Sequence, residues 1–159
     1  MRRFFRTMCF VLMTFMAVTF LSCGTEYPSE GYFTVDGVNY ILNEARLEDV
    51  GYADGYYQLR LTMDNTSHND FHSINFLLYS EVNNYLPSGL YTHYKYDEVY
   101  EHRFKRGGCV IGNNIETVIA VGSVKVTKSN EIYTISIDCE DVNGKDINGY
   151  YNGEIKVVI

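Results

Sequence analysis

From residue 31 onward, apolar and polar residues alternate in short segments of the chain. In the clearest segment, residues 57–63, four apolar side chains alternate with three polar ones. Side chains of a β-strand point alternately to the two faces of a sheet, so this pattern predicts a strand with one face buried and the other in solvent. No stretch of a dozen residues after Cys23 shows the 3.6-residue period of an amphipathic helix. The pattern therefore predicts an all-β domain.

The same alternation recurs along the domain, and turn signals separate the segments. Asp36-Gly37 lies between residues 32–35 and 38–41 and can adopt the positive φ angles of a tight hairpin turn. Residues 43–50 contain helix formers, but their neighbours favour a strand with Ala45 and Leu47 pointing inward. Residues 118–126 are apolar on both faces at their start, which predicts a central strand. Further inward sets are Ile74, Phe76 and Leu78, and Tyr133, Ile135, Ile137 and Cys139.

The predicted segments amount to about eight to ten strands. A sheet of that size must bury one face and protect its edges, so we expect a single antiparallel β-sandwich, with a closed barrel-like domain as the alternative. The chain of 159 residues has the length of one domain, and its 46% of apolar residues are enough to fill a core. We assign this β domain to residues 31–159.

The first 22 residues predict an export signal. Arg2, Arg3 and Arg6 precede an uncharged apolar run, which is shorter than the roughly 20 residues needed to cross a bilayer. The segment 20–24 resembles the lipobox of bacterial lipoproteins, which implies cleavage before Cys23 and attachment of acyl chains to that residue. An ordinary secretory peptide with an incidental cysteine is the alternative. Residues 23–30 would then form the lipidated cysteine and a short tether.

The charge of the chain limits the partners that we expect. The full chain has 13 Lys and Arg against 20 Asp and Glu, a formal charge of −7. Removal of residues 1–22 takes away three Arg, which leaves a charge of −10. Nucleic acid is not an expected partner because phosphate binding needs clustered basic residues. Attachment to a membrane would come from the lipid anchor and not from a basic patch.

Two cysteines remain in the predicted domain, Cys109 and Cys139. An exported protein folds in an oxidising compartment, where the two could form a disulfide. The alternative is two buried thiols that pack as small apolar side chains.

Aromatic and polar residues are densest between Tyr91 and Phe104. The chain has 15 Tyr and no Trp. On an alternating strand, Tyr94, Tyr96, Tyr100, His102 and Phe104 would share one face, and Tyr91 and His93 the other. A tyrosine ring can contact the apolar face of a sugar while its hydroxyl bonds a sugar hydroxyl. We therefore identify Tyr91, Tyr94, Tyr96 and Tyr100 as candidate ligand-binding residues, with cross-strand packing as the alternative.

Other polar groups carry weaker signals. His68, Asp70 and His72 alternate as metal ligands could, but they fall in a polar loop, and we predict no metal site. Residues 141–146 offer oxygen ligands without the spacing of an EF-hand, which favours a hairpin turn. The basic residues Arg103, Lys105 and Arg106 suggest either contact with an anionic glycan or a solvated strand end. No nucleophile or phosphate-binding motif occurs, so we expect a non-catalytic protein without a cofactor.

Several segments together resemble small envelope lipoproteins of the Bacteroidetes. These are the lipobox-like start, Phe33-Thr34-Val35-Asp36-Gly37, Leu86-Pro87-Ser88-Gly89-Leu90-Tyr91, Gly122-Ser123-Val124-Lys125-Val126, Tyr133-Thr134-Ile135 and Gly149-Tyr150-Tyr151-Asn152-Gly153. The resemblance implies an antiparallel β domain tethered to the bacterial outer membrane, in either leaflet. We expect a binding or interaction module whose partner is a glycan or another envelope protein. A barrel that carries a small hydrophobic ligand and a structural subunit of an envelope assembly are the alternatives.

Overall fold

The structure is a computed structural model that describes residues 29–66, 71–96, 99–112 and 115–158. Within these ranges the chain forms strands, turns and loops, and the predicted all-β class is confirmed. The strands are β1 (Glu30–Val35), β2 (Val38–Leu42), β3 (Glu44–Ala53), β4 (Tyr56–Asp64), β5 (His72–Ser80), β6 (Gly89–His93), β7 (Arg103–Ile111), β8 (Ile115–Ser129), β9 (Ile132–Asp141), β10 (Asp146–Glu154) and β11 (Lys156–Val158).

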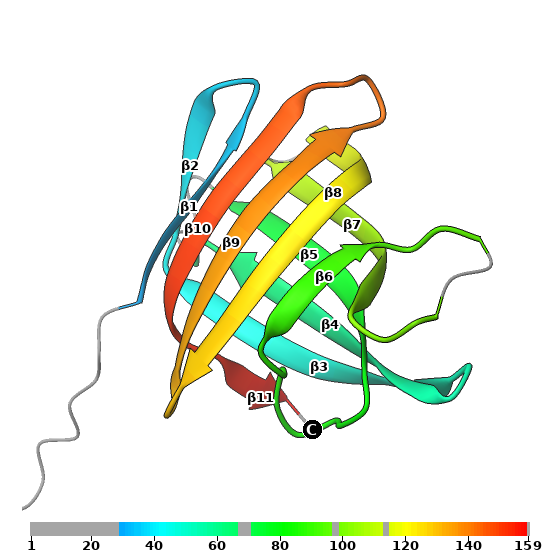
Figure 1. Ribbon diagram of the computed structural model, residues 1–159. Coiled ribbons are helices and arrows are strands. Elements are labelled where there is room, and N and C mark those ends of the chain that lie inside the picture. Colours follow the sequence, from blue (N-terminus) through cyan, green and yellow to red (C-terminus); the bar gives the residue numbers. More distant parts are fainter. Residues whose placement is uncertain (1–28, 67–70, 97–98, 113–114, 159) are drawn as a thin grey trace, which may run out of the picture.

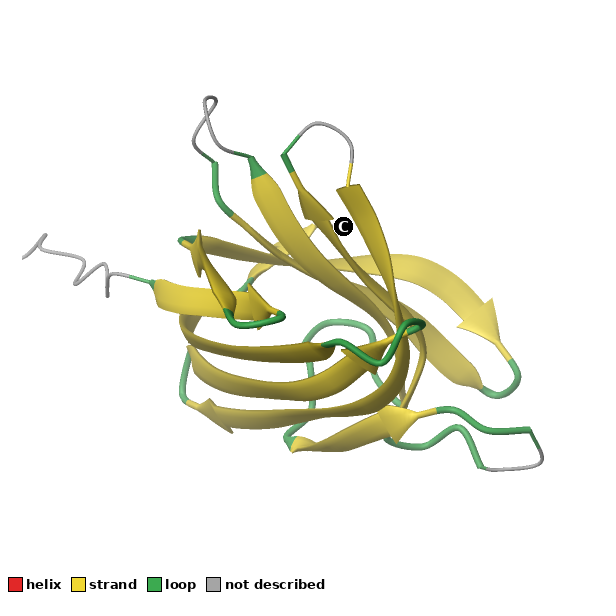
Figure 2. Ribbon diagram, turned by 90° about the horizontal axis from the view of Figure 1, so that it is seen from above, coloured by secondary structure: helices red, strands yellow, loops and turns green. Residues whose placement is uncertain are grey.

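All eleven strands belong to one sheet, in the order β11-β3-β4-β5-β7-β6-β8-β9-β10-β1-β2, with an additional pairing between β7 and β8. Most neighbours are antiparallel, whereas β6 runs parallel to β7 and β11 runs parallel to β3. The sheet curls on itself into a half-barrel (Figures 1 and 2). The expected antiparallel sandwich of eight to ten strands is thus corrected to one curled, mixed sheet of eleven.

Two strand-to-strand connections of a single residue bring the ends of this sheet together. Asn43 alone separates β2 from β3, and Ile155 alone separates β10 from β11. Strands β2 and β10 lie near one end of the strand order, and β3 and β11 lie at the other. The backbone N–H of Asn43 also donates a hydrogen bond of 3.0 Å to the carbonyl of Asp64 in β4. The curl is therefore fixed by chain connectivity as well as by packing.

The concave side of the sheet holds the core. The predicted inward residues of β3, β5 and β9 are buried as expected, and so are those of β4 except Tyr57, which is half-buried. Phe76 and Phe104 meet edge to face across β5 and β7, with ring centroids 5.5 Å apart. Fully buried large side chains include Phe33, Leu59, Leu61, Met63, Ile74, Phe76, Tyr91, Phe104 and Tyr151. The interior of the half-barrel is thus filled by apolar side chains.

Two hairpins turn through the same dipeptide. Asp36-Gly37 has φ angles of 53° and 80°, and Asp54-Gly55 has 58° and 86°. Positive φ at both central residues matches the twist of the flanking strands, and glycine adopts it without steric cost. The predicted turn at Asp36-Gly37 is confirmed, and the second one places the tyrosines described below.

Two further expectations about strands are corrected. Residues 91–104 do not form one strand, because β6 ends at His93 and β7 starts at Arg103. Strand β8 is central, but Val118 and Val121 are exposed. A bulge between Ile119 and Val121 shifts the pairing with β9, so the inward side switches from Ile119 to Val124 and Val126.

The predicted export signal and the lipidation site Cys23 lie outside the described residues. Every described strand lies between Glu30 and Val158. A chain that begins at Gly24 therefore keeps all the strand pairings and core contacts of the described fold. No helix among the described residues has the length and apolar character needed to cross a membrane.

Candidate functional site

Three tyrosines gather at the tip of the β3–β4 hairpin. The Asp54-Gly55 turn pairs Tyr52 with Tyr57 across the two strands, and Tyr56 pairs with Ala53. The rings of Tyr52 and Tyr57 meet edge to face at 5.0 Å. The Tyr52 side chain is 65% exposed, whereas Tyr57 is half-buried and packs against the core.

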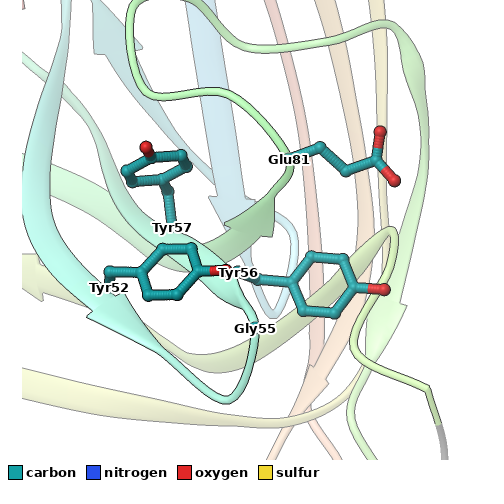
Figure 3. Close-up of a pocket in the computed structure, with 5 residues that line it drawn as sticks. All are labelled: Tyr52, Gly55, Tyr56, Tyr57 and Glu81. Atoms are coloured by element: carbon teal, nitrogen blue, oxygen red, sulfur yellow. The ribbon is translucent and has the colours of Figure 1, made fainter.

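These rings border a shallow depression of about 590 Å³. Its lining residues are Tyr52, Gly55, Tyr56, Tyr57 and Glu81, and Figure 3 shows the three rings and the Glu81 carboxylate around it. Gly55 offers no side chain, and no heavy atom lies within 4 Å of the position that a Cβ would take there. The depression is therefore open to solvent over the hairpin tip.

A smaller cavity of about 150 Å³ adjoins this depression. The two share Tyr56 and Glu81 as lining residues, so they are neighbours, and we call them together the tyrosine cleft. The remaining lining residues of the inner cavity are Tyr79, Ser80, Val82, Tyr85, Pro87, Tyr91, Glu101 and His102. A volume of 150 Å³ is below that of a drug-sized ligand pocket, and only a small part of a larger ligand could enter it.

Local hydrogen bonds hold the wall of the inner cavity. The Tyr91 hydroxyl donates to the carbonyl of Pro87 at 3.0 Å, and the Val82 N–H donates to the Ser80 hydroxyl at 3.1 Å. Burial raises the pKa of Tyr91 above its usual value of 10.0, so this hydroxyl keeps its proton. The Tyr91 side chain is consequently a fixed wall of the cavity.

Gly89 makes room for a histidine at the same wall. A Cβ on Gly89 would lie 2.7 Å from the imidazole of His102, which is too close for any side chain there. The ring of His102 meets that of Tyr91 edge to face at 5.2 Å. His102 itself has a φ of 50°, a backbone conformation that costs energy in a non-glycine residue. The packing against Gly89 and Tyr91 holds His102 in place despite this cost.

A second aromatic group flanks the cleft. Tyr94 and Tyr100 stack face to face at 4.5 Å, and Tyr79 lies 4.4 Å from Tyr100. A hydrogen bond with Tyr94 is the main cause that raises the pKa of Tyr100, with smaller effects of desolvation and neighbouring charge. Tyr79 is fully buried, and its hydroxyl has no hydrogen-bond partner among the described residues. Tyr56 connects this group to the cleft, with its ring 6.4 Å from that of Tyr100.

The four tyrosines predicted from the sequence occupy three different environments. Tyr91 lines the inner cavity, whereas Tyr94 and Tyr100 stack on each other beside the cleft. Tyr96 is 89% exposed and borders neither depression. The shared faces expected for residues 91–104 are wrong because Tyr94 to Tyr100 lie in the connection between β6 and β7. Ligand contact by these residues stays a prediction.

The sequence reasoning missed the residues that line the outer depression. The alternating pattern assigns Tyr57 only to a strand and singles out neither Tyr52, Tyr56 nor Glu81. The available signal was the run Tyr52-Ala53-Asp54-Gly55-Tyr56-Tyr57, in which a tight-turn dipeptide is flanked by aromatic residues. Such a hairpin places its aromatic side chains close together at a sheet end.

Both domain cysteines are free and buried. Cys109 in β7 pairs with Thr117, and Cys139 in β9 pairs with Gly122, so β8 separates the two. Strands two places apart in a sheet are about 9–10 Å apart, which exceeds the Cα separation that a disulfide allows. The disulfide is therefore not formed, and buried thiols are what the structure shows. Burial raises the pKa of Cys139 to about 12 and also raises that of Cys109.

The remaining candidate groups are the alternating His68, Asp70 and His72, the basic residues of β7 and the turn at residues 141–146. His72 is buried, and its ring meets those of Phe33 and Tyr40 edge to face, whereas His68 and Asp70 lie outside the described residues. Among the described residues, no cluster of His, Cys, Asp or Glu could hold a metal ion. A guanidinium N–H of Arg103 donates to the Thr92 hydroxyl, and Lys105 and Arg106 are exposed. The predicted hairpin turn at residues 141–146 is confirmed.

Comparison of the chain with known protein families, with curated proteins and with solved structures gives no match. Because a fold alone does not determine function, any functional proposal depends on the chemistry of the site.

Proposed function

We propose that this protein is a non-catalytic binding module of the bacterial cell envelope that holds a glycan in the tyrosine cleft. The observation that carries the proposal is that two neighbouring depressions share Tyr56 and Glu81 and are lined by several tyrosines. Aromatic rings contact the apolar C–H faces of sugar rings, and tyrosine hydroxyls and carboxylates bond their hydroxyls. The open outer depression suits an extended chain of sugars, and the inner cavity suits one small substituent of it.

The membrane side of the proposal comes from the amino-terminal sequence. The charged start, the apolar run and the Ser22-Cys23 junction support an acyl anchor on Cys23. The anchored chain would then present the β domain at the outer membrane. A carrier of a hydrophobic ligand is less well supported, because apolar side chains fill the interior of the half-barrel and leave the cleft at its end.

Thermal unfolding of the chain beginning at Gly24, with and without a panel of neutral and charged oligosaccharides, tests the proposal. A ligand that binds only the folded state at 100 times its Kd stabilises it by about 2.7 kcal/mol. We expect Tyr52→Ala and Tyr56→Ala to remove the stabilisation by a bound oligosaccharide. Tyr96→Ala is the matched control, because Tyr96 lies outside the cleft and is 89% exposed.

Stabilisation that survives both cleft variants but disappears with Tyr96→Ala would place the binding site elsewhere. Absence of binding across the oligosaccharides would refute the glycan proposal. The anchor is tested separately by Cys23→Ser in the full chain, which should move the protein from the membrane fraction to the soluble fraction.

A further inference from the structure

The tyrosine cleft contains two carboxylates, with His102 as the basic side chain among its lining residues. Glu81 lines both depressions, and Glu101 lines the inner cavity. Among the described residues, no Lys or Arg lines either one. Neither glutamate forms an ion pair with a described residue. The cleft therefore has two carboxylates that can interact with a ligand.

The rings around Glu81 add a second attraction for positive charge. The face of a tyrosine ring is negative, and a cation within about 6 Å of its centre is attracted to it. Tyr52, Tyr56 and Tyr57 line the same depression as Glu81, whose side chain lies on the side of Tyr56 (Figure 3). A protonated amine in this depression would be attracted by the aromatic faces and by the Glu81 carboxylate, whereas the carboxylate would repel an anion.

The acidity of the whole chain acts in the same direction. The formal charge is −7 for the full sequence, and it becomes more negative if the export signal is removed. Such a field raises the local concentration of cationic ligands and lowers that of anionic ones. The outer depression is also open to solvent, so a charged group can enter it without losing all of its hydration.

We propose that the tyrosine cleft selects glycans that carry a protonated amino group, with the ammonium held between the rings of Tyr52, Tyr56 and Tyr57 and the carboxylate of Glu81. This inference rests on the proposed glycan-binding function and specifies its ligand class. It also predicts that anionic glycans do not bind there, despite the basic residues Arg103, Lys105 and Arg106, because none of these three lines the cleft.

Three β-1,4-linked disaccharides that differ only at C2 test the proposal. The glucosamine dimer carries an amine, cellobiose a hydroxyl and diacetylchitobiose an acetamide. Their affinities for the chain beginning at Gly24 are measured by NMR titration at pH 6 in low salt. We expect the glucosamine dimer to bind about tenfold more tightly than cellobiose, from the combined ion-pair and cation–π attractions. This preference should weaken as salt is added, because ions screen exposed charges.

A charge-neutralising variant assigns the preference to one residue. Glu81→Gln should reduce the preference for the glucosamine dimer to a few-fold, because the cation–π attraction remains, and leave the affinity for cellobiose within about twofold, since it removes the charge and keeps the shape. Glu131→Gln is the matched control, because Glu131 is exposed in the β8–β9 turn and lines neither depression. It removes the same charge from the chain and should leave the preference unchanged.

The outcomes separate this inference from the proposal on which it rests. Equal binding of the glucosamine dimer and cellobiose would overturn amine selection and leave glycan binding intact. A preference that Glu81→Gln does not reduce would also overturn it. Absence of binding by all three disaccharides would overturn both proposals.

Discussion

At the scale of single residues, one carboxylate organises the turn between β9 and β10. Asp141 is buried, and its Oδ1 accepts hydrogen bonds from the backbone N–H of Asn143 at 2.7 Å and of Lys145 at 2.9 Å. The Asp141 carboxylate is one of the groups that could have been a calcium ligand in this segment. Its Oδ1 instead accepts hydrogen bonds from the backbone of the turn, in which Gly144 has a φ of 76°. The Asp141 carboxylate therefore has a structural role in the turn and not a metal-binding one.

This arrangement predicts a specific pH dependence of stability. The backbone hydrogen bond from Lys145 is the main cause that lowers the pKa of Asp141 below its usual 3.8. Because the pKa of Asp141 is lower in the folded state, its charged form stabilises the fold fully at any pH above the pKa of the unfolded state. This stabilisation is lost as the pH falls through the lower pKa of the folded state. Asp141→Asn should therefore be less stable than the wild type at neutral pH, and the difference should shrink below about pH 3.8.

Urea denaturation across this pH range measures the effect. Asp138→Asn is the control, because Asp138 is an exposed residue of the same strand and its change removes the same charge. A stability difference between Asp141→Asn and the wild type that stays constant from neutral to acid pH would contradict the assignment of the effect to the charge of Asp141.

At the scale of elements, β7 depends on a glycine for its place in the core. A Cβ on Gly107 would lie 2.9 Å from the Phe76 ring and 3.0 Å from the Ile119 side chain. No positive φ is involved, so the constraint is one of space. Gly107→Ala should destabilise the fold by about 1–3 kcal/mol, the usual cost of overpacking a core.

A double-mutant cycle with Phe76→Leu tests the cause of this loss. The smaller leucine side chain in that background leaves room for the added methyl group, so Gly107→Ala should then cost less free energy of unfolding than it does with Phe76 present. Equal losses in the two backgrounds, measured by denaturant unfolding, would show that Phe76 does not limit the space at Gly107.

The same strand shows which elements the sequence could predict. Strand β4 alternates apolar and polar residues, and β5 has an apolar residue at every second position from Ile74 to Leu78. Their inward residues Leu59, Leu61, Ile74 and Phe76 were therefore predicted correctly. Strand β7 was not predicted, because one of its inward positions is Gly107 and its other positions include basic residues. A hydrophobic pattern cannot identify a core position where the packing leaves room only for glycine.

At the scale of the whole molecule, the curl of the sheet and the cleft at its end could not be predicted. Both depend on residues that are distant in sequence. The cleft combines the β3–β4 hairpin tip with Glu81 after β5 and Glu101 before β7. The curl depends on the breaks at Asn43 and Ile155, where one strand ends and the next joins the opposite end of the sheet. Local alternation contains no information about which strand each edge will meet.

Strand β11 should therefore matter more for closing the sheet than its three residues suggest. It pairs with residues 46–48 of β3, and Lys156 forms an ion pair with Glu44. Truncation after Glu154 removes this pairing and should lower the free energy of unfolding by about 2–4 kcal/mol, from a few lost backbone hydrogen bonds and the exposed edge of β3. Hydrogen exchange should quicken at the amides of β3 and stay slow in β8 and β9.

Lys156→Met, which keeps the strand and removes the exposed ion pair, should have little effect on either measurement. Unchanged exchange in β3 after truncation would mean that the end of the sheet is held by the β2–β3 connection alone.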